Sequence, residues 1–288
     1  MHLSLCYSPL SPFCRKVRLA MDHKQLAFSL VETDSLQDLP VWNPRAEVPI
    51  LLHGDFAIFN SPDILAYLDR AYPELPVYPA EARRHAEVRA WERLADTQLD
   101  AIVTVIGTWS FADLPPMPPG LFDAAQREIG VIYDQLQAQL ADGRPWVAGE
   151  IGAADFALYP HVAAGSALGL KFDPERHPDV QRWFKALRAR PEARIDTAAV
   201  RDWWARRDQK DVDTARVNWG AHRLEWLLAN GHADWFANQV RQGKVLWSAG
   251  PDNNAFNSPL APAWARAIRA QRRGGGVDAA AATPAPAA

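Results

Sequence analysis

The chain passes from a strand into a helix at Ser11-Pro12-Phe13-Cys14. A short apolar run, His2–Tyr7, precedes this stretch, and an amphipathic run follows it. Serine is a preferred N-cap residue and proline is favoured at the first helical position, so the sequence predicts that a helix begins at Pro12. A helix N-terminus offers unpaired backbone N–H groups and the positive end of the helix dipole. The stretch is therefore a suitable place to hold a thiolate.

The composition is that of a globular protein. The chain has 288 residues, a net charge of −3 and two cysteines, Cys6 and Cys14. This length suffices for one large or two ordinary domains. The charge gives no indication of nucleic acid or an anionic membrane as partner, and no apolar run reaches membrane-spanning length. Two cysteines make no disulfide framework and no secretory signal precedes the first strand, so we expect a cytoplasmic protein.

Strand-like and helical patterns alternate in the first part of the chain. The predicted elements are strand His2–Tyr7, helix Pro12–His23, strands Leu26–Leu30, Val48–Leu52 and Phe56–Phe59, and a helix opened by Pro62. The last two strands are joined by a turn at His53-Gly54-Asp55. The order β-α-β and then β-β-α is the thioredoxin-like arrangement, so we predict an α/β domain of this type over residues 1–78.

Helical periodicity dominates after a linker at Leu75–Pro79. The predicted helices are Glu81–Thr108, Leu121–Ala141, Ala153–Leu168 and Pro178–Arg190. The start at Ala153 is well specified, because Asp155 stands at the third helical position and Ile151 and Phe156 can form a hydrophobic staple. We therefore predict an all-helical domain over residues 81–195.

A third section, residues 196–273, holds seven of the twelve tryptophans. Disordered segments are poor in aromatic residues, so this section is predicted to be an ordered, mainly helical extension. We favour an extra layer packed on the helical domain, with tryptophans as anchors. A lid over a substrate site and a partner-binding surface are the alternatives. Residues 274–288 are rich in Gly, Ala and Pro and predict a disordered tail.

Four segments together resemble the cytosolic glutathione transferases. Residues Tyr7–Arg18 resemble the active-site start of bacterial, serine-type and theta-like members. Val48-Pro49-Ile50-Leu51 resembles the Val-Pro segment of the family, and Asn60-Ser61 resembles its glutamyl-binding segment. Gly149–Asp155 resembles the helix-capping signature of the family's helical domain. The resemblance covers about residues 1–195 and rests on the order and spacing of these segments.

The resemblance implies an enzyme, a glutathione S-transferase with glutathione as co-substrate, and usually a homodimer. Ser11 would stabilise the glutathione thiolate, Val48 would offer its backbone to the cysteinyl part, and Pro49 would be the cis-proline. Asn60 and Ser61 would hold the γ-glutamyl end. The second substrate would be a small hydrophobic electrophile, and the reaction a conjugation or a related thiol-dependent dehalogenation or reduction.

Three residues depart from the pattern of the family. Asn60 stands where Glu, Asp or Gln is frequent, and it should hold the glutamyl ammonium less strongly. Glu47 stands where Lys or Gln is common, which puts an acid on the side of the glycine carboxylate, with Arg45 as a counter-charge. Gly152 replaces the usual Ser or Thr cap, at a cost of a few tenths of a kcal/mol. The first two departures predict weakened glutathione binding.

The chemistry assigned to Ser11 has competitors. A free thiol has a pKa of about 8.5, and a hydroxyl hydrogen bond together with a helix dipole lowers that pKa and yields a nucleophile. The rival hydroxyls are Tyr7 and Ser8, because other transferase classes use a tyrosine near the end of the first strand. If Ser11 were not used by the chemistry, it would simply be an N-cap.

Cys14 supports a different hypothesis. The stretch from Ser11 to Cys14 resembles a glutaredoxin Cys-Pro-Tyr-Cys motif whose first cysteine is replaced by serine. Cys14 could still form a mixed disulfide with glutathione, as a redox protein would, although we favour a small apolar helix residue. A non-catalytic binding or interaction module is a further alternative, motivated by the Trp-rich extension, Asn60 and Glu47.

Apolar side chains that could line an electrophile pocket are Trp109 and Phe111, after the first long helix, together with Leu10 beside Ser11. Packing of Trp109 and Phe111 in the interdomain core or a dimer interface is equally consistent with the sequence. The eight histidines show no ligand-like spacing and there is no His-Glu-x-x-His motif, so we expect no metal.

Overall fold

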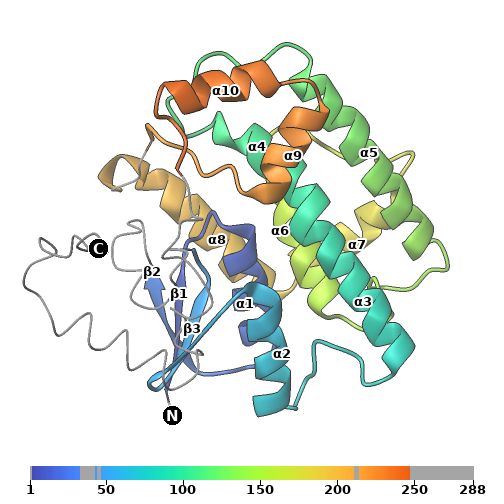
Figure 1. Cartoon of the computed structure of the whole chain (residues 1–288). Coiled ribbons are helices and arrows are strands. Elements are labelled where there is room, and N and C mark those ends of the chain that lie inside the picture. Colours follow the sequence, from blue (N-terminus) through green and yellow to red (C-terminus); the bar gives the residue numbers. More distant parts are fainter. Residues whose placement is uncertain (1, 33–42, 44–46, 211–213, 247–288) are drawn as a thin grey trace, which may run out of the picture.

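The N-terminal part of the chain forms a four-stranded mixed sheet (Figure 1). Its strands are β1 (Leu3–Tyr7), β2 (Phe28–Glu32), β3 (Ile50–His53) and β4 (Phe56–Phe59), in the order β2-β1-β3-β4. β1 and β2 are parallel, and the other pairs are antiparallel. The structure is a computed structural model and describes residues 2–32, 43, 47–210 and 214–246.

Two helices accompany the sheet, α1 (Pro12–His23) and α2 (Ser61–Ala71). The thioredoxin-like order of elements predicted from the sequence is confirmed, with β1 one residue shorter than predicted and with shifted bounds for β2 and β3. β2 begins two residues later than predicted, because the N–H of Leu26 still donates to the carbonyl of Met21 at the end of α1. β3 begins at Ile50, since Pro49 has no N–H to donate to the ladder.

The second part of the chain is all-helical, as predicted. Its elements are α3 (Ala82–Leu94), a π-helical turn (Ala95–Leu99), α4 (Asp100–Thr108), α5 (Leu121–Leu140), α6 (Ala153–Ala167), α7 (Pro178–Arg188) and α8 (Pro191–Ala205). The single helix predicted for Glu81–Thr108 is thus three consecutive segments. Pro191 stands at the first position of α8, and the sequence division at residue 195 falls inside this helix.

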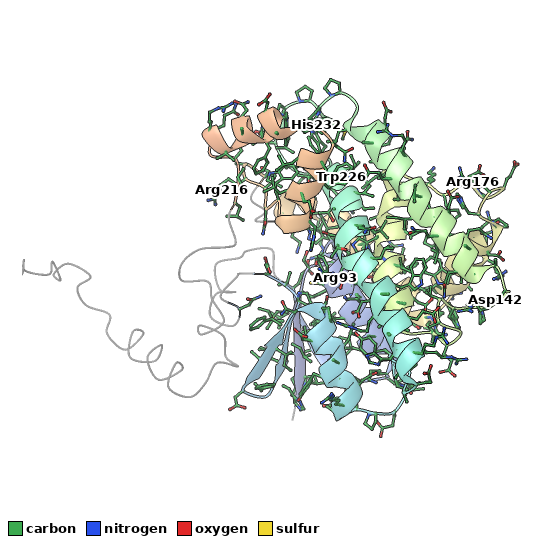
Figure 2. The ribbon with its side chains drawn as sticks, turned by 45° about the vertical axis from the view of Figure 1, so that its right-hand side comes forward. Arg93, Asp142, Arg176, Arg216, Trp226 and His232 are labelled. Atoms are coloured by element: carbon green, nitrogen blue, oxygen red, sulfur yellow. The ribbon has the colours of Figure 1, made fainter. Side chains whose placement is uncertain are left out.

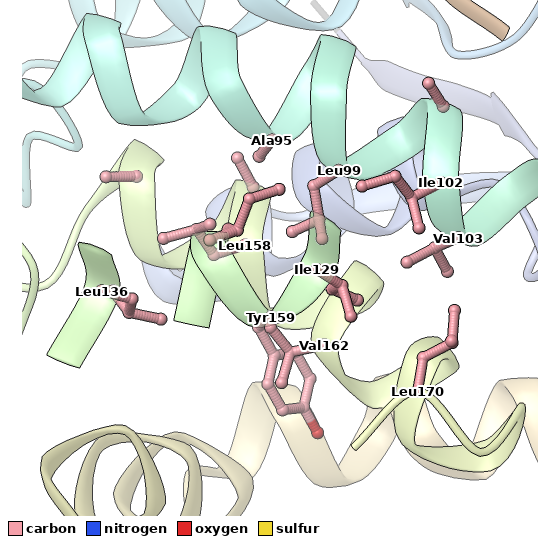
Figure 3. Close-up of a cluster of buried hydrophobic side chains, with 14 of the residues drawn as sticks. Ala95, Leu99, Ile102, Val103, Ile129, Leu136, Leu158, Tyr159, Val162 and Leu170 are labelled. Carbon is pink, nitrogen blue, oxygen red and sulfur yellow. The ribbon is translucent and has the colours of Figure 1, made fainter. Parts of the chain in front are cut away.

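The core of the helical part is built around α6. All residues from Gly152 to Val162 are buried, so this helix contacts neighbours on every side. Figure 3 shows its Leu158 and Val162 in one cluster with Leu99 of the π-helical turn and Ile129 of α5. The same cluster of buried side chains includes Leu19 and Ala20 of α1, so one core joins the sheet domain to the helical domain.

The described part of the extension is helical and packs on the helical domain. It contains a short 3₁₀ turn (Arg207–Gln209), α9 (Ala221–Ala229) and α10 (Ala233–Arg241). Figures 1 and 2 show both helices at the end of the helical domain away from the sheet, with Trp226 and His232 labelled there. The indole N–H of Trp226 donates to Glu128 of α5 at 2.6 Å, and Leu227 is fully buried.

The rest of the extension, with Trp247 and Trp264, and the predicted tail at 274–288 lie outside the described residues. The packing of α9 and α10 agrees with the favoured alternative, a packed layer, whereas Lys210 of the same section contacts the sheet through Glu32. Within the described ranges, none of the helices combines the length and apolarity needed to span a bilayer.

Asp155 links the start of α6 to two other segments. Its Oδ1 accepts hydrogen bonds from the N–H of Val147 at 3.1 Å and from the indole N–H of Trp183 at 2.7 Å, and its Oδ2 accepts from the N–H of Gly152 at 3.1 Å. We expect Asp155→Ala to lower the free energy of unfolding by about 3 kcal/mol, because three buried donors lose their acceptor. Urea denaturation followed by circular dichroism measures this change.

The matched control is Asp142→Ala. Asp142 lies on the surface (Figure 2) and pairs with Arg144 in its own loop, so its loss should leave the denaturation midpoint unchanged. Equal midpoints for the two variants would contradict the structural role of Asp155.

Candidate functional site

The strand register brings three predicted site segments to one edge of the sheet. Cys6 of β1 pairs with Ile50 of β3, and Ile50 pairs with Phe59 of β4. The segments that leave these strands at that edge therefore lie close together: the turn from Ser8 to Ser11 after β1, Val48 and Pro49 before β3, and Asn60 and Ser61 after β4.

Ser11 is the N-cap of α1. Its backbone is extended, with φ −74° and ψ 117°, and its Oγ accepts a hydrogen bond from the N–H of Cys14 at 3.4 Å. The Ser11 N–H donates to the carbonyl of Ser8, which fixes the turn before the helix. A side-chain hydrogen bond from Ser11 also reaches the Cys14 thiol, and the hydroxyl hydrogen can rotate between that sulfur and an acceptor outside the protein. The half-buried hydroxyl can therefore donate to a ligand atom at the start of α1.

The rival hydroxyl of Tyr7 is directed into the interior. Tyr7 is buried, and its hydroxyl accepts a hydrogen bond from the guanidinium of Arg18 at 3.0 Å. Burial raises the pKa of Tyr7 above its ordinary value, although the charge of Arg18 opposes this. Ser8, the other rival, is half-buried and its backbone N–H is directed to the sulfur of Cys14.

Cys14 is a buried thiol without the features of a nucleophile. The side chain is fully buried, and its Sγ accepts the N–H of Ser8 at 3.4 Å. Burial raises the pKa of Cys14 to about 12, and the hydrogen bonds from Ser11 and Ser8 only partly offset this. The other cysteine, Cys6, is also buried, which raises its pKa too. The geometry agrees with the small apolar helix residue that the sequence favoured for Cys14.

The Val48–Pro49 peptide bond is cis, as the family resemblance implied for Pro49. Asn60 is exposed with φ +68°, and its side-chain amide donates to Asp63 at 3.1 Å. Ser61 is the first residue of α2 and is buried. The carbonyl of Glu47 accepts the side-chain amide of Asn43 at 2.9 Å, whereas Arg45 lies outside the described residues.

α8 runs antiparallel to α1 across the domain junction. Near its start, Arg190 approaches His23 at the end of α1, with 3.4 Å between NH2 and Nδ1. One to two turns later Asp196 receives three hydrogen bonds from Arg15. Nε donates to Oδ1 at 3.0 Å and to Oδ2 at 3.1 Å, and NH2 donates to Oδ2 at 2.7 Å. Trp203 lies two further turns along the same helix. Because α8 runs antiparallel to α1, its C-terminal end extends beyond the N-terminus of α1, where Ser11 lies.

A cavity of about 360 Å³ lies at that end of α8. It is lined by Phe111, Trp203, Arg207, Asp208, Lys210 and Thr214. Arg207 donates to the carbonyl of Phe111 at 3.2 Å. Lys210 pairs with Glu32 at 2.7 Å, and Glu32 is paired with Tyr7 in the sheet. These contacts tie the cavity to the edge of the sheet at which Ser11 lies.

Of the three residues predicted to line an electrophile pocket, only one lines this cavity. Phe111 lines the cavity. Trp109 donates its indole N–H to the carbonyl of Pro115 at 2.9 Å, and its ring lies 5.5 Å from that of Trp235, so it packs against the extension. Leu10 is half-buried and is not among the described residues that line the cavity.

Trp203, Arg207 and Lys210 were not predicted as pocket residues from the sequence. Their position depends on the antiparallel pairing of α8 with α1, for which no local pattern exists. The described residues also contain no group of three or more His, Cys, Asp or Glu side chains arranged to hold a metal ion.

A thioredoxin-like sheet joined to an all-helical domain, with a capped helix start at the junction, defines a thiol-binding class of protein. The model of the glutathione S-transferase N-terminal domain matches residues 5–76, and that of the C-terminal domain matches residues 108–191. Together the matches span more than half of the chain. The chain belongs to the glutathione S-transferase family of enzymes. Neither match extends beyond residue 191, so the extension lies outside both.

Individual relatives agree with this assignment. Glutathione S-transferase U2 of Arabidopsis thaliana is 29% identical over 189 residues, which cover 62% of this chain and 80% of the relative. Glutathione S-transferase GstB of Escherichia coli K12 is 26% identical over 166 residues, 54% of this chain and 76% of the relative. A glutathione S-transferase from Methylobacterium radiotolerans, solved with glutathione sulfonate, is 27% identical with a TM-score of 0.59, covering 68% of this chain and 94% of that one.

Because both cysteines are buried, we expect them to react poorly with alkylating reagents in the folded protein. With the pKa of Cys14 raised to about 12, thiolate is nearly absent at pH 8, so iodoacetamide should leave Cys14 unmodified in the folded protein. In urea both cysteines should be modified. Mass spectrometry of the intact protein, followed by peptide mapping, measures this. Rapid modification of Cys14 in the folded protein would contradict its inertness and revive the redox hypothesis.

Proposed function

We propose that Ser11 stabilises the thiolate of glutathione and that this thiolate attacks a small hydrophobic electrophile. The observation that carries the proposal is the half-buried Ser11 hydroxyl, which caps α1 at the edge of the sheet and can turn its hydrogen from the neutral Cys14 thiol to a stronger acceptor such as a thiolate. A thiolate there would accept that hydrogen bond and would face the positive end of the α1 dipole. Both effects favour the thiolate over the thiol and so lower the pKa of the bound thiol.

The start of α2 is a suitable site for the γ-glutamyl end of glutathione. Backbone N–H groups at a helix start attract a carboxylate, and the hydroxyl of Ser61 adds a donor. Asn60 alone predicts weak binding of the glutamyl ammonium group, and its contact with Asp63 offsets this weakness. It holds the Asp63 carboxylate beside Asn60, and this carboxylate can supply the negative charge that an ammonium group requires. We assign the backbone of Val48 to the cysteinyl part, as the resemblance implies.

The cavity beyond the start of α1 is the proposed electrophile site. Phe111 and Trp203 suit the flat apolar part of a substrate, and the polar lining residues Arg207, Asp208, Lys210 and Thr214 would face its polar substituents. The sulfur forms a bond to the electrophilic carbon, and in a substitution the leaving group departs with the bonding pair. Dehalogenation would follow the same course with halide as the leaving group. A homodimer and a cytoplasmic location, both typical of the family, complete the proposal.

The Ser11 assignment is tested with Ser11→Ala. Because the bound thiol loses a hydrogen bond, we expect its pKa to rise toward about 8.5 and kcat/KM to fall about 100-fold. Ultraviolet titration of the bound thiolate and steady-state kinetics with a chloronitrobenzene measure the two effects.

The control for this test is Tyr7→Phe. Its hydroxyl binds Arg18 in the interior, so its loss should lower stability but leave the pKa of the bound thiol unchanged. If Ser11→Ala behaves as the wild type does, the thiolate is held by another group. If calorimetry finds no binding of glutathione to the wild type, the non-catalytic binding module becomes the better hypothesis.

The electrophile site is tested with Phe111→Ala. Removal of an aromatic wall of the cavity should raise KM for the chloronitrobenzene about 10-fold and leave KM for glutathione unchanged. Ile195→Ala is the matched control, since Ile195 is an exposed apolar residue of α8 that does not line the cavity. If Phe111→Ala changed the KM for glutathione as well as the KM for the chloronitrobenzene, Phe111 would not be specific to the electrophile site.

A further inference from the structure

A series of buried contacts leads from the extension to the turn that carries Ser11. It begins at Arg223 of α9, which holds both carboxylate oxygens of Asp100 at the start of α4. Nε donates to Oδ2 at 2.9 Å and NH2 donates to Oδ1 at 3.2 Å. NH1 of Arg223 donates to the carbonyl of Asn218, which fixes the guanidinium on the extension side.

Asp100 is a buried carboxylate that depends on this partner. Its side chain is 5% exposed, and burial alone would raise its pKa. The charge of Arg223 and the contacts with His161 outweigh burial, so the pKa of Asp100 lies below its usual range and the group is ionised. The hydroxyl of Thr104 donates to Oδ1 at 2.7 Å. Arg223 is therefore the counter-charge that the extension supplies to the interior of the helical domain.

His161 of α6 is the next member of the series. Its Nε2 lies 3.5 Å from Oδ1 of Asp100 and has no closer hydrogen-bonding partner among the described residues. Its Nδ1 donates to the carbonyl of Ala157 at 2.9 Å. The ring is thus held between its own helix and the Asp100 carboxylate, and it is almost fully buried.

The His161 ring also contacts Phe13, the second residue of α1. The two rings meet edge to face, with their centroids 6.2 Å apart and an angle of 83° between their planes. Phe13 lies between Ser11, the N-cap, and Cys14, whose N–H donates to the Ser11 hydroxyl. A displaced His161 ring would remove one of the contacts by which the helical domain supports the first turn of α1.

We propose that Arg223 is a positioning residue for Ser11, acting through Asp100, His161 and Phe13. Without Arg223, the buried carboxylate of Asp100 loses its counter-charge and must find another partner or water. A close-packed interior transmits such a change to the neighbouring rings. The extension is then a part of the active site, although it lies outside the matched family domains. The catalytic consequence rests on the proposed function of Ser11, whereas the structural link does not.

The first experiment tests the link in the ligand-free, full-length protein. Hydrogen exchange of the segment from Ser8 to Cys14 is compared between the wild type, Arg223→Gln and the matched control Arg241→Gln, an exposed arginine at the end of α10. We expect this segment to exchange about 10-fold faster in Arg223→Gln than in the wild type, and at the wild-type rate in the control. In Arg223→Lys, which keeps the positive charge, the rate should lie between the two. Unchanged exchange in Arg223→Gln overturns the proposal, whatever the protein binds.

The second experiment tests the consequence for glutathione. In Arg223→Gln we expect the pKa of bound glutathione to rise and kcat/KM to fall about 10-fold at a temperature at which the variant is fully folded. In a Phe13→Leu background, which lacks the aromatic contact, the same substitution should have no further effect on that pKa.

The outcomes separate the two proposals. A lower melting temperature with an unchanged thiol pKa and unchanged exchange would leave Arg223 a structural residue and overturn the positioning role. If Arg223→Gln raised the pKa of bound glutathione as much in the Phe13→Leu background as in the wild type, the route through Phe13 would be overturned. Faster exchange in Arg223→Gln combined with no glutathione binding to the wild type would support the link and refute the proposed function.

Discussion

The structure depends on the burial of α1 on all sides. One face of this helix packs on the sheet and the other on α6 and α8, so every residue from Cys14 to Met21 is buried. Three of these residues are cations, Arg15, Lys16 and Arg18. A buried cation is costly unless it is paired and hydrogen-bonded, so the helical domain can dock only where its acids meet these side chains.

The partners of the three cations come from different elements. Arg15 is held by Asp196 of α8, and Lys16 by Glu92 of α3 at 3.0 Å and by Asp96 of the π-helical turn at 2.6 Å. Arg18 binds the hydroxyl of Tyr7 in the sheet. The position of α1 is therefore fixed from three directions. Since Ser11 caps this helix, its hydroxyl is placed by the interior of the protein rather than by its own surface loop.

The elements could be predicted from the sequence better than their docking. The N-cap at Ser11 and the capping of α6 by Asp155 are local patterns, and both appear at the predicted residues. The burial of Lys16 could not be predicted, because a lysine on an amphipathic helix ordinarily marks the solvent face. It becomes an interior residue only through Glu92 and Asp96, which lie about 80 positions away in the chain.

The same reasoning explains why Trp109 was ambiguous. An aromatic residue after a helix can line a pocket or fill a core, and nothing within its own segment distinguishes the two. Here the choice is made by Trp219 and Trp235, whose rings enclose Trp109 from the extension. Phe111, two residues later, meets no such partner in the part of the chain that the structure describes, and it lies at the wall of the cavity with Trp203. The extension thus helps to determine which aromatic side chains of the loop after α4 line the cavity.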